Sequence, residues 1–323
     1  MIPGLFWPDA SFRIDPLPAL EMLLARGDAS KSAKMSIEEW LCRAFGVKRQ
    51  NDWPVAPLFR PEGERGYCLR ADPVHLQLMR DRFVLIGGEL LPVSGEETAR
   101  LIDTLNRHFS RDGFLFTAEN GIWLLHLPEA PDLFTTPLSD VLGKDISKHL
   151  PQGEEAMRWN HVLNEIQMLL HDHPVNDERE KRGEIPVNSL WLWGGGVAPE
   201  IACSGYASIR SDDPLANLLA ARTGIPCGPV PEEAGNWISS LAEGEHLLVL
   251  KDVSLPWKYR DGDEWDGRLR KLEQQWFFPL HQAVQKGLSL TLSDCESGLH
   301  FGVEKLDLWK FWKRIRPLLE HPA

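Results

Sequence analysis

The chain has 323 residues, of which 43% are hydrophobic and 25% charged, and its formal net charge at pH 7 is -12. This composition is typical of a folded protein with one large or two modest domains, and it argues against global disorder. The negative charge argues against a general nucleic-acid or anionic-membrane surface unless basic residues gather locally. We therefore expect neither a nucleic acid nor a membrane as a partner.

Three further features indicate a cytoplasmic protein. The sequence has no apolar run long enough to span a bilayer, and it has no signal-peptide pattern. Its five cysteines are odd in number and scattered. This is typical of reduced thiols rather than of a disulfide framework or a zinc site.

Two helices are expected in the first 62 residues. Prolines introduce the first, at 17–26, and Gly27 ends it. The second, at 36–45, begins at Ser36 and has Glu39 three residues later, which is a capping-box pattern. In this interpretation Ser36 is a helix cap.

From about residue 66 to 150, the sequence pattern is typical of an antiparallel α+β module. Strands are expected at 67–69 and 82–86, with Gly87 and Gly88 turning the chain into a partner strand at 89–93. Ser94 then caps an amphipathic helix, and a second hairpin joins 114–117 to 122–127.

Helices and strands alternate in the remainder of the chain. Helices are expected at 154–170, 214–222, 268–286 and 306–319, and strands at 190–193, 246–251 and 288–292. Such alternation is typical of parallel βαβ units in an open, wound sheet.

Residues 171–196 join a charge-rich loop to a short apolar strand that runs into Gly194, Gly195 and Gly196. A buried strand that opens into a glycine turn is where α/β proteins place ligands, although most such turns are structural. Four polar side chains flank the glycines, namely Asn176, Arg179, Arg182 and Asn188.

Arginine forms bidentate bonds to phosphate or carboxylate, and backbone amides can face the same anion. The pattern predicts that these seven residues bind a phosphorylated or carboxylated small molecule. The alternative is that Arg179 and Arg182 pair with neighbouring acidic side chains on a solvated loop.

A wider pattern extends from about residue 60 to 230. It is carried by the segments 66–73, 87–100, 136–144, 173–176 (His-Pro-Val-Asn) and 188–196. These segments resemble the archaeal-type, cofactor-independent phosphoglycerate mutases of the alkaline phosphatase superfamily, and more closely the regulatory proteins of the RpfE type. The resemblance implies an alkaline-phosphatase-like α/β core with a wound, mostly parallel sheet, formed by residues 1–62 and 185–323. It also implies an α+β cap inserted at 63–184.

The family activity is the interconversion of 2- and 3-phosphoglycerate through a phosphoserine on a two-metal site. Several residues that such a site needs are replaced here. Asp9, Asp252 and Asp294 remain as carboxylates, but no histidine stands at an expected metal position, and Ser36 has no aspartate beside it. We therefore expect a protein that has lost catalysis, needs no cofactor, and acts as a ligand-binding or regulatory module.

Two alternatives remain open. The chain is an active mutase or phosphohydrolase if Ser36 or water is the nucleophile and manganese or magnesium binds Asp9, Asp252 and Asp294. It is a protein-interaction scaffold if the tryptophans of its C-terminal third form a docking surface, with Trp309 and Trp312 on one helix face.

Overall fold

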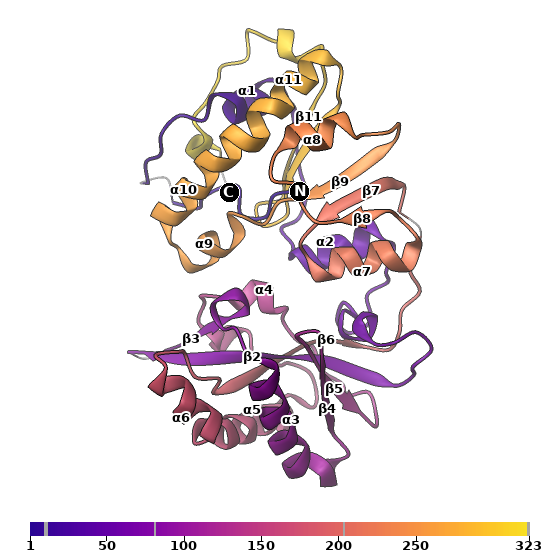
Figure 1. Cartoon of the computed structure of the whole chain (residues 1–323), viewed down its shortest axis with the longest axis vertical. Coiled ribbons are helices and arrows are strands. Elements are labelled where there is room, and N and C mark those ends of the chain that lie inside the picture. The colour runs from indigo at the N-terminus through magenta and orange to yellow at the C-terminus, as the bar shows by residue number, and fades with distance from the viewer. Residues whose placement is uncertain (10–11, 81, 203, 322–323) are drawn as a thin grey trace. The chain divides into compact units, whose positions relative to one another are not determined.

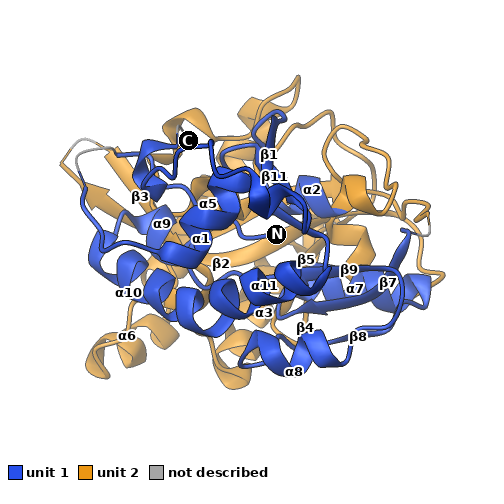
Figure 2. Ribbon diagram, turned by 90° about the horizontal axis from the view of Figure 1, so that it is seen from above, with its two compact units in different colours: residues 1–41, 203–323 blue, residues 42–202 orange. Residues whose placement is uncertain are grey.

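The computed structural model describes residues 1–9, 12–80, 82–202 and 204–321. The chain divides into two compact units, which Figure 2 shows in different colours. Unit 1 is Met1–Leu41 with Cys203–Ala323, and unit 2 is Cys42–Ala202. Within the described residues it is a mixed α/β protein with three sheets.

Unit 2 is built on one antiparallel sheet. Its strands are β2 (Tyr67–Met79), β3 (Arg82–Gly87), β4 (Leu115–Glu119), β5 (Ile122–Leu127) and β6 (Ser189–Gly196). The long strand β2 crosses the unit in Figure 1 and pairs with β3, β5 and β6.

The pairing of β6 shows that unit 2 is larger than the cap predicted at 63–184. The strand at 190–193 was expected to return to the α/β core in a parallel sheet, but Ser189 lies opposite Val74 in an antiparallel pair with β2. Because a strand belongs to the sheet that binds its backbone, unit 2 extends beyond the predicted limits of 63 and 184. It begins at Cys42 and ends at Ala202.

The helices that lie wholly within unit 2, in the part of the chain that the structure describes, are α3 (Gly95–Phe109), α4 (Leu138–Val141), α5 (Ala156–His171) and α6 (Pro174–Lys181). In Figure 1, α3, α5 and α6 lie on one face of the sheet. The predicted cap of α3 is confirmed, because Ser94 and Glu97 form a reciprocal capping box. Trp123, Trp159 and Ile166 are buried in the core of this unit.

Two turn predictions for unit 2 were wrong. β3 pairs with β2, with Met79 opposite Arg82, and residues 88–90 form a short 3-10 turn rather than a strand. The three glycines do not turn the chain after β6; they are its last residues. Trp193 and Gly196 lie opposite Arg70 and Cys68, so two glycines face one residue in a β-bulge, and Gly194 has φ +66°.

Unit 1 contains two three-stranded sheets. The parallel sheet has the order β8 (Cys227–Gly228), β7 (Tyr206–Ser211), β9 (Glu245–Val249). The antiparallel sheet has the order β1 (Asp28–Lys31), β11 (Leu299–Val303), β10 (Leu290–Asp294). The backbone at Met1 and Ile2 bridges them, because Leu250 N donates to Met1 O and Ile2 N donates to Ser293 O.

The unit 1 helices are α1 (Pro18–Arg26), α7 (Pro214–Thr223), α8 (Ala234–Ser239), α9 (Ser254–Tyr259), α10 (Gly262–Leu272) and α11 (Phe278–Lys286), and α2 (Ile37–Ala44) spans the limit between the units. Leu20, Trp265 and Trp276 are buried in the core of unit 1. No helix of the described residues is both long and apolar enough to cross a bilayer.

The helix expected at 306–319 is absent. Only short 3-10 turns form there, at Asp307–Trp309 and Leu318–Glu320. The guanidinium of Arg26 donates to the carbonyls of Lys310 and Lys313, which a helix would use internally. Pro317 also lacks the N–H that a helix interior needs.

Candidate functional site

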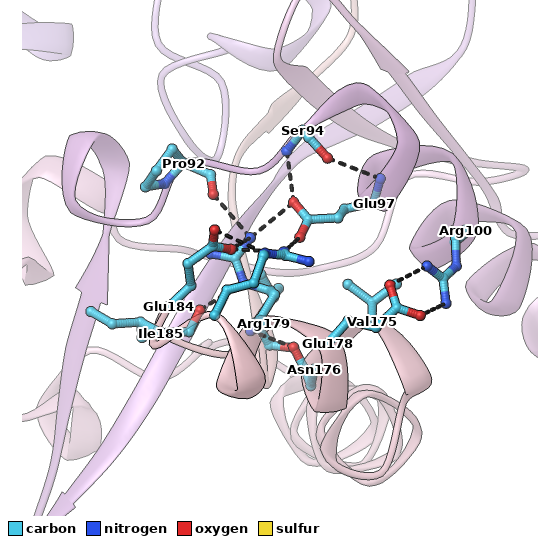
Figure 3. Close-up of polar contacts among 12 residues, drawn as sticks. Pro92, Ser94, Glu97, Arg100, Val175, Asn176, Glu178, Arg179, Glu184 and Ile185 are labelled. Carbon is cyan, nitrogen blue, oxygen red and sulfur yellow. Dashed lines mark hydrogen bonds and ion pairs between the residues drawn. The ribbon is translucent and has the colours of Figure 1, made fainter.

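Arg179 lies on α6 and is 1% exposed. Its Nε donates to Ile185 O at 2.8 Å, and its Nη1 donates to Pro92 O and to Glu97 Oε2, each at 3.0 Å (Figure 3). These contacts tie α6 to the start of α3. The guanidinium therefore has a structural role inside unit 2.

Arg182 reaches the same carboxylate from the end of α6. Its Nη2 donates to Glu97 Oε1 at 2.5 Å and to Glu184 Oε2 at 2.8 Å, and its side chain is 46% exposed. Burial opposes the ionisation of Glu97, but hydrogen bonds from Ser94 and the charges of Arg179 and Arg182 hold its pKa below the usual value. Glu97 is thus an internal anion between two arginines.

The two predicted asparagines bind backbone. Asn176 is 3% exposed; its Nδ2 donates to Leu170 O and Val187 O, and its Oδ1 accepts from Val187 N. Asn188 accepts from Leu76 N at 2.7 Å and donates to Leu76 O at 3.1 Å. The structure brings Arg179 and Arg182 together, whereas the asparagines fix the chain on either side of them. Anion binding by these residues stays a prediction.

The amides of the glycine bulge face a carboxylate that the protein itself supplies. Gly195 N donates to Asp52 Oδ2 at 3.4 Å, and Thr135 N donates to Asp52 Oδ1 at 2.9 Å. Gly194 N donates to Thr135 Oγ1 at 3.1 Å. Asp52 is 4% exposed, and burial raises its pKa. The bulge is therefore closed around an internal anion.

Unit 1 has a second group of charged residues where its strands end. Asp294, the last residue of β10, is fully buried and accepts from the amides of Gly4, Phe6 and Glu296 at 3.0, 3.4 and 3.0 Å. Burial raises the pKa of Asp294 to about 6.

Two lysines of unit 1 form ion pairs with carboxylates. Lys258 Nζ lies 2.6 Å from Glu296 Oε1, and both side chains are less than 10% exposed. Lys251 Nζ lies 2.8 Å from Asp213 Oδ2, and Asp213 also caps α7. A buried ammonium of this kind balances a carboxylate without a bound cation.

The residues predicted for an active site do not form a metal centre. Asp9 and Asp252 are exposed, while Asp294 is enclosed by backbone amides. Ser36 Oγ accepts from Glu39 N at 3.1 Å, so its predicted role as a helix cap is confirmed. No group of three or more His, Cys, Asp or Glu in the described part of the chain could hold a metal ion. The donor set does not fit the two metal ions that the resemblance implies.

Sequence reasoning missed Asp52, Glu97 and Lys258 as charged residues of these clusters. Glu97 carried a local signal, since it stands three residues after the predicted cap at Ser94. Asp52 and Lys258 carried none, because their partners are 83 and 38 residues away.

Comparison with known proteins finds a family model that matches a segment of unit 2. The family model of the 2,3-bisphosphoglycerate-independent phosphoglycerate mutases matches residues 75–176. This segment is phosphoglycerate-mutase-like. The resemblance to the archaeal-type cofactor-independent mutases is therefore confirmed.

Two relatives show how far the similarity extends. A probable 2,3-bisphosphoglycerate-independent phosphoglycerate mutase of Geobacter sulfurreducens is 31% identical over 144 residues, 43% of this chain and 36% of that protein. The mutase of Methanosarcina mazei is 34% identical over 113 residues, 33% of this chain and 28% of that protein. The chain thus spans about a third of the length of the curated relatives it matches.

Two solved structures are also similar. The PH0037 protein from Pyrococcus horikoshii has a TM-score of 0.46 and 14% identity, covering 94% of this chain and 86% of its own. The cofactor-independent phosphoglycerate mutase from Thermoplasma acidophilum has a TM-score of 0.35 and 16% identity, covering 89% and 82%.

Proposed function

We propose that this phosphoglycerate-mutase-like protein has lost two-metal catalysis and acts as a ligand-binding or regulatory module. The observation that carries the proposal is the chemistry around Asp294. Backbone amides surround its carboxylate, and the Lys258 ammonium pairs with the neighbouring Glu296. A fixed ammonium beside these carboxylates opposes the entry of a divalent cation. A regulatory role of the RpfE type is part of the same proposal.

The architecture of unit 1 is proposed to be alkaline-phosphatase-like. The parallel pairing of β7 with β8 and β9 supports a wound sheet, and the Met1–Ile2 backbone continues it toward β10. Unit 2, which interrupts unit 1 in the sequence, then corresponds to the inserted cap.

The loss of catalysis is tested with the purified full chain. We expect no conversion of 2- or 3-phosphoglycerate and no hydrolysis of p-nitrophenyl phosphate, with or without manganese or magnesium. Equilibrium dialysis should likewise show no stoichiometric binding of manganese. Metal-dependent turnover that is lost in Ser36→Ala or Asp294→Asn, and retained in Ser32→Ala, would establish an active mutase or phosphohydrolase instead.

The ligand is proposed to be a phosphorylated or carboxylated small molecule that binds at Arg182. This arginine is 46% exposed, whereas Arg179 is enclosed, so an external anion can compete only for Arg182. A ligand present at a hundred times its Kd stabilises the folded state by about 2.7 kcal/mol and raises Tm.

A thermal-shift screen of phosphoglycerates, phosphosugars and nucleotides tests this site. We expect a shift in the wild type that is lost in Arg182→Ala and kept in Arg111→Ala, which alters another exposed arginine of unit 2. Equal shifts in all three proteins, or no shift in any, would show that Arg182 forms only internal ion pairs and does not bind the ligand.

A further inference from the structure

Residues 306–316 of unit 1 expose several large apolar side chains in a short stretch. Trp309, Phe311 and Trp312 are 70%, 77% and 70% exposed. Leu306 and Ile315, at the two ends, are 78% and 40% exposed. We call residues 306–316 the aromatic segment. Aromatic and other large apolar side chains are normally buried. Their exposure together in one segment indicates a surface that contacts a membrane or another molecule.

The aromatic segment is held in place and is not a loose tail. Its backbone is bound by Arg26, which is 8% exposed and donates to the carbonyls of Lys310 and Lys313. Lys310 and Lys313 pair with Asp28 at 2.8 and 3.0 Å, and Leu308 packs on the core of unit 1. The yellow end of the chain accordingly runs close to α1 in Figure 1, and the turn at Asp307–Trp309 contacts that helix.

The charge of this region is opposite to that of the whole chain. Residues 305–316 contain five basic residues and one acidic residue, although the net charge of the protein is -12. Lys305, Arg314 and Arg316 are exposed, and none of them forms an ion pair with another described residue. This is the local gathering of cations that the overall composition does not exclude.

We propose that the aromatic segment docks the protein on an anionic lipid surface. Tryptophan and phenylalanine side chains enter the headgroup region of a bilayer, and lysine and arginine beside them are attracted to anionic lipids. The segment anchors the protein at the surface and does not cross the bilayer.

The alternation of charge and aromatic side chains favours lipid over a protein partner. In the sequence Trp-Lys-Phe-Trp-Lys-Arg-Ile-Arg, at 309–316, every apolar side chain is next to a cation. The core of a protein interface is depleted of lysine, because its ammonium would have to be desolvated there. A headgroup layer accepts both groups, since its phosphates bind the cations while the aromatic rings lie deeper.

Co-sedimentation of the full chain with vesicles tests this proposal. We expect binding to vesicles that contain phosphatidylglycerol, about tenfold weaker binding to vesicles of phosphatidylcholine alone, and release by salt. The triple variant Trp309→Ser, Phe311→Ser, Trp312→Ser and the double variant Arg314→Glu, Arg316→Glu should each bind the anionic vesicles at least about tenfold more weakly.

Matched control variants change exposed apolar or basic side chains outside the aromatic segment. Met157→Ser with Met168→Ser deletes two methionines of unit 2 that are 76% and 77% exposed, and Lys48→Glu with Lys271→Glu makes the same charge change. Both controls should bind as the wild type does. Circular dichroism should be unchanged in every variant, because the altered side chains are exposed.

Three outcomes would overturn the proposal. They are no binding to anionic vesicles, equal binding of the wild type and the triple variant, and self-association in sedimentation velocity that the triple variant abolishes. The third would show that a second copy of the chain covers the aromatic segment.

Discussion

Glu97 and Arg179 form a buried ion pair across 82 residues of sequence, with 3.0 Å between Oε2 and Nη1. Their side chains are 9% and 2% exposed. The pair joins the first turn of α3 to α6, and Arg179 also binds the carbonyls of Pro92 and Ile185. Removing one partner leaves the other buried with weaker compensation, from Arg182 for Glu97 or from Glu184 for Arg179, whereas removing both leaves neither charge.

We predict that Arg179→Met and Glu97→Gln each lower the free energy of unfolding by about 3–5 kcal/mol. The double variant should be more stable than the sum of the two losses implies. Urea unfolding of all four proteins measures the coupling in a double-mutant cycle. A coupling energy of zero would contradict the role assigned to the pair. Arg111→Ala serves as an exposed control.

Ser36 should matter for stability because it caps α2. Ser36→Ala removes the acceptor of Glu39 N and should cost about 1 kcal/mol, while Ser36→Asn should restore most of it. Thermal denaturation of the two variants measures the difference. A variant Ser36→Asn that is as unstable as Ser36→Ala would show that the hydroxyl has another role.

Burial of Asp294 predicts a dependence of stability on pH. Burial raises its pKa from the usual 3.8 to about 6, so the folded state binds a proton more tightly than the unfolded state does. Its contribution to stability is therefore greatest below about pH 4 and falls as the pH rises to about 6, by about 3 kcal/mol.

The comparison of wild type with Asp294→Asn isolates this contribution. Guanidinium unfolding at a series of pH values should show that the variant loses the decline between about pH 4 and 6. The exposed control Asp263→Asn should keep it. An identical pH profile for Asp294→Asn would mean that Asp294 has a normal pKa in the folded state.

The glycine bulge in β6 has no room for a side chain at its centre. A Cβ on Gly195 would lie 2.2 Å from the Tyr67 hydroxyl oxygen and 2.7 Å from Leu69 Cδ2. Gly195→Ala should therefore destabilise the protein by about 1–3 kcal/mol. Gly95→Ala, where a Cβ meets no atom within 4 Å, should be neutral or stabilising in the same assay.

Local signals predicted some helices well, namely α1, α2, α3, α5 and α7. They failed at 306–319, where the expected helix is absent, and at α6 (Pro174–Lys181), where a charge-rich loop was expected. The proline and glycine around α1 and the capping box of α3 act within a few residues, so the sequence alone is sufficient to predict them. The hairpin of β4 and β5 was predicted for the same reason, since Asn120 and Gly121 adopt the positive φ that its turn needs.

Features that depend on contacts between residues far apart in the sequence could not be predicted. The pairing of β6 with β2 joins residues more than a hundred positions apart, and the apolar run of β6 fits a parallel or an antiparallel sheet equally well. The C-terminal aromatic segment has helical periodicity, but Arg26 binds its carbonyls from another part of the chain. Of the charged clusters, the position of Asp294 was anticipated, whereas its amide partners at Gly4 and Phe6 were not.

The two units differ in when their strands become available during synthesis. Unit 2 is one uninterrupted stretch, Cys42–Ala202, so its sheet can form as soon as β6 leaves the ribosome. In unit 1, β1 pairs with β11, and Ala29 lies opposite Phe301. The apolar residues near the start of the chain, among them Ile2, Leu5 and Phe6, have no completed core to enter until β11 has been synthesised. The first 41 residues therefore remain without their core partners while the whole of unit 2 is synthesised. Chaperones are suited to protect the apolar side chains that are exposed in this interval.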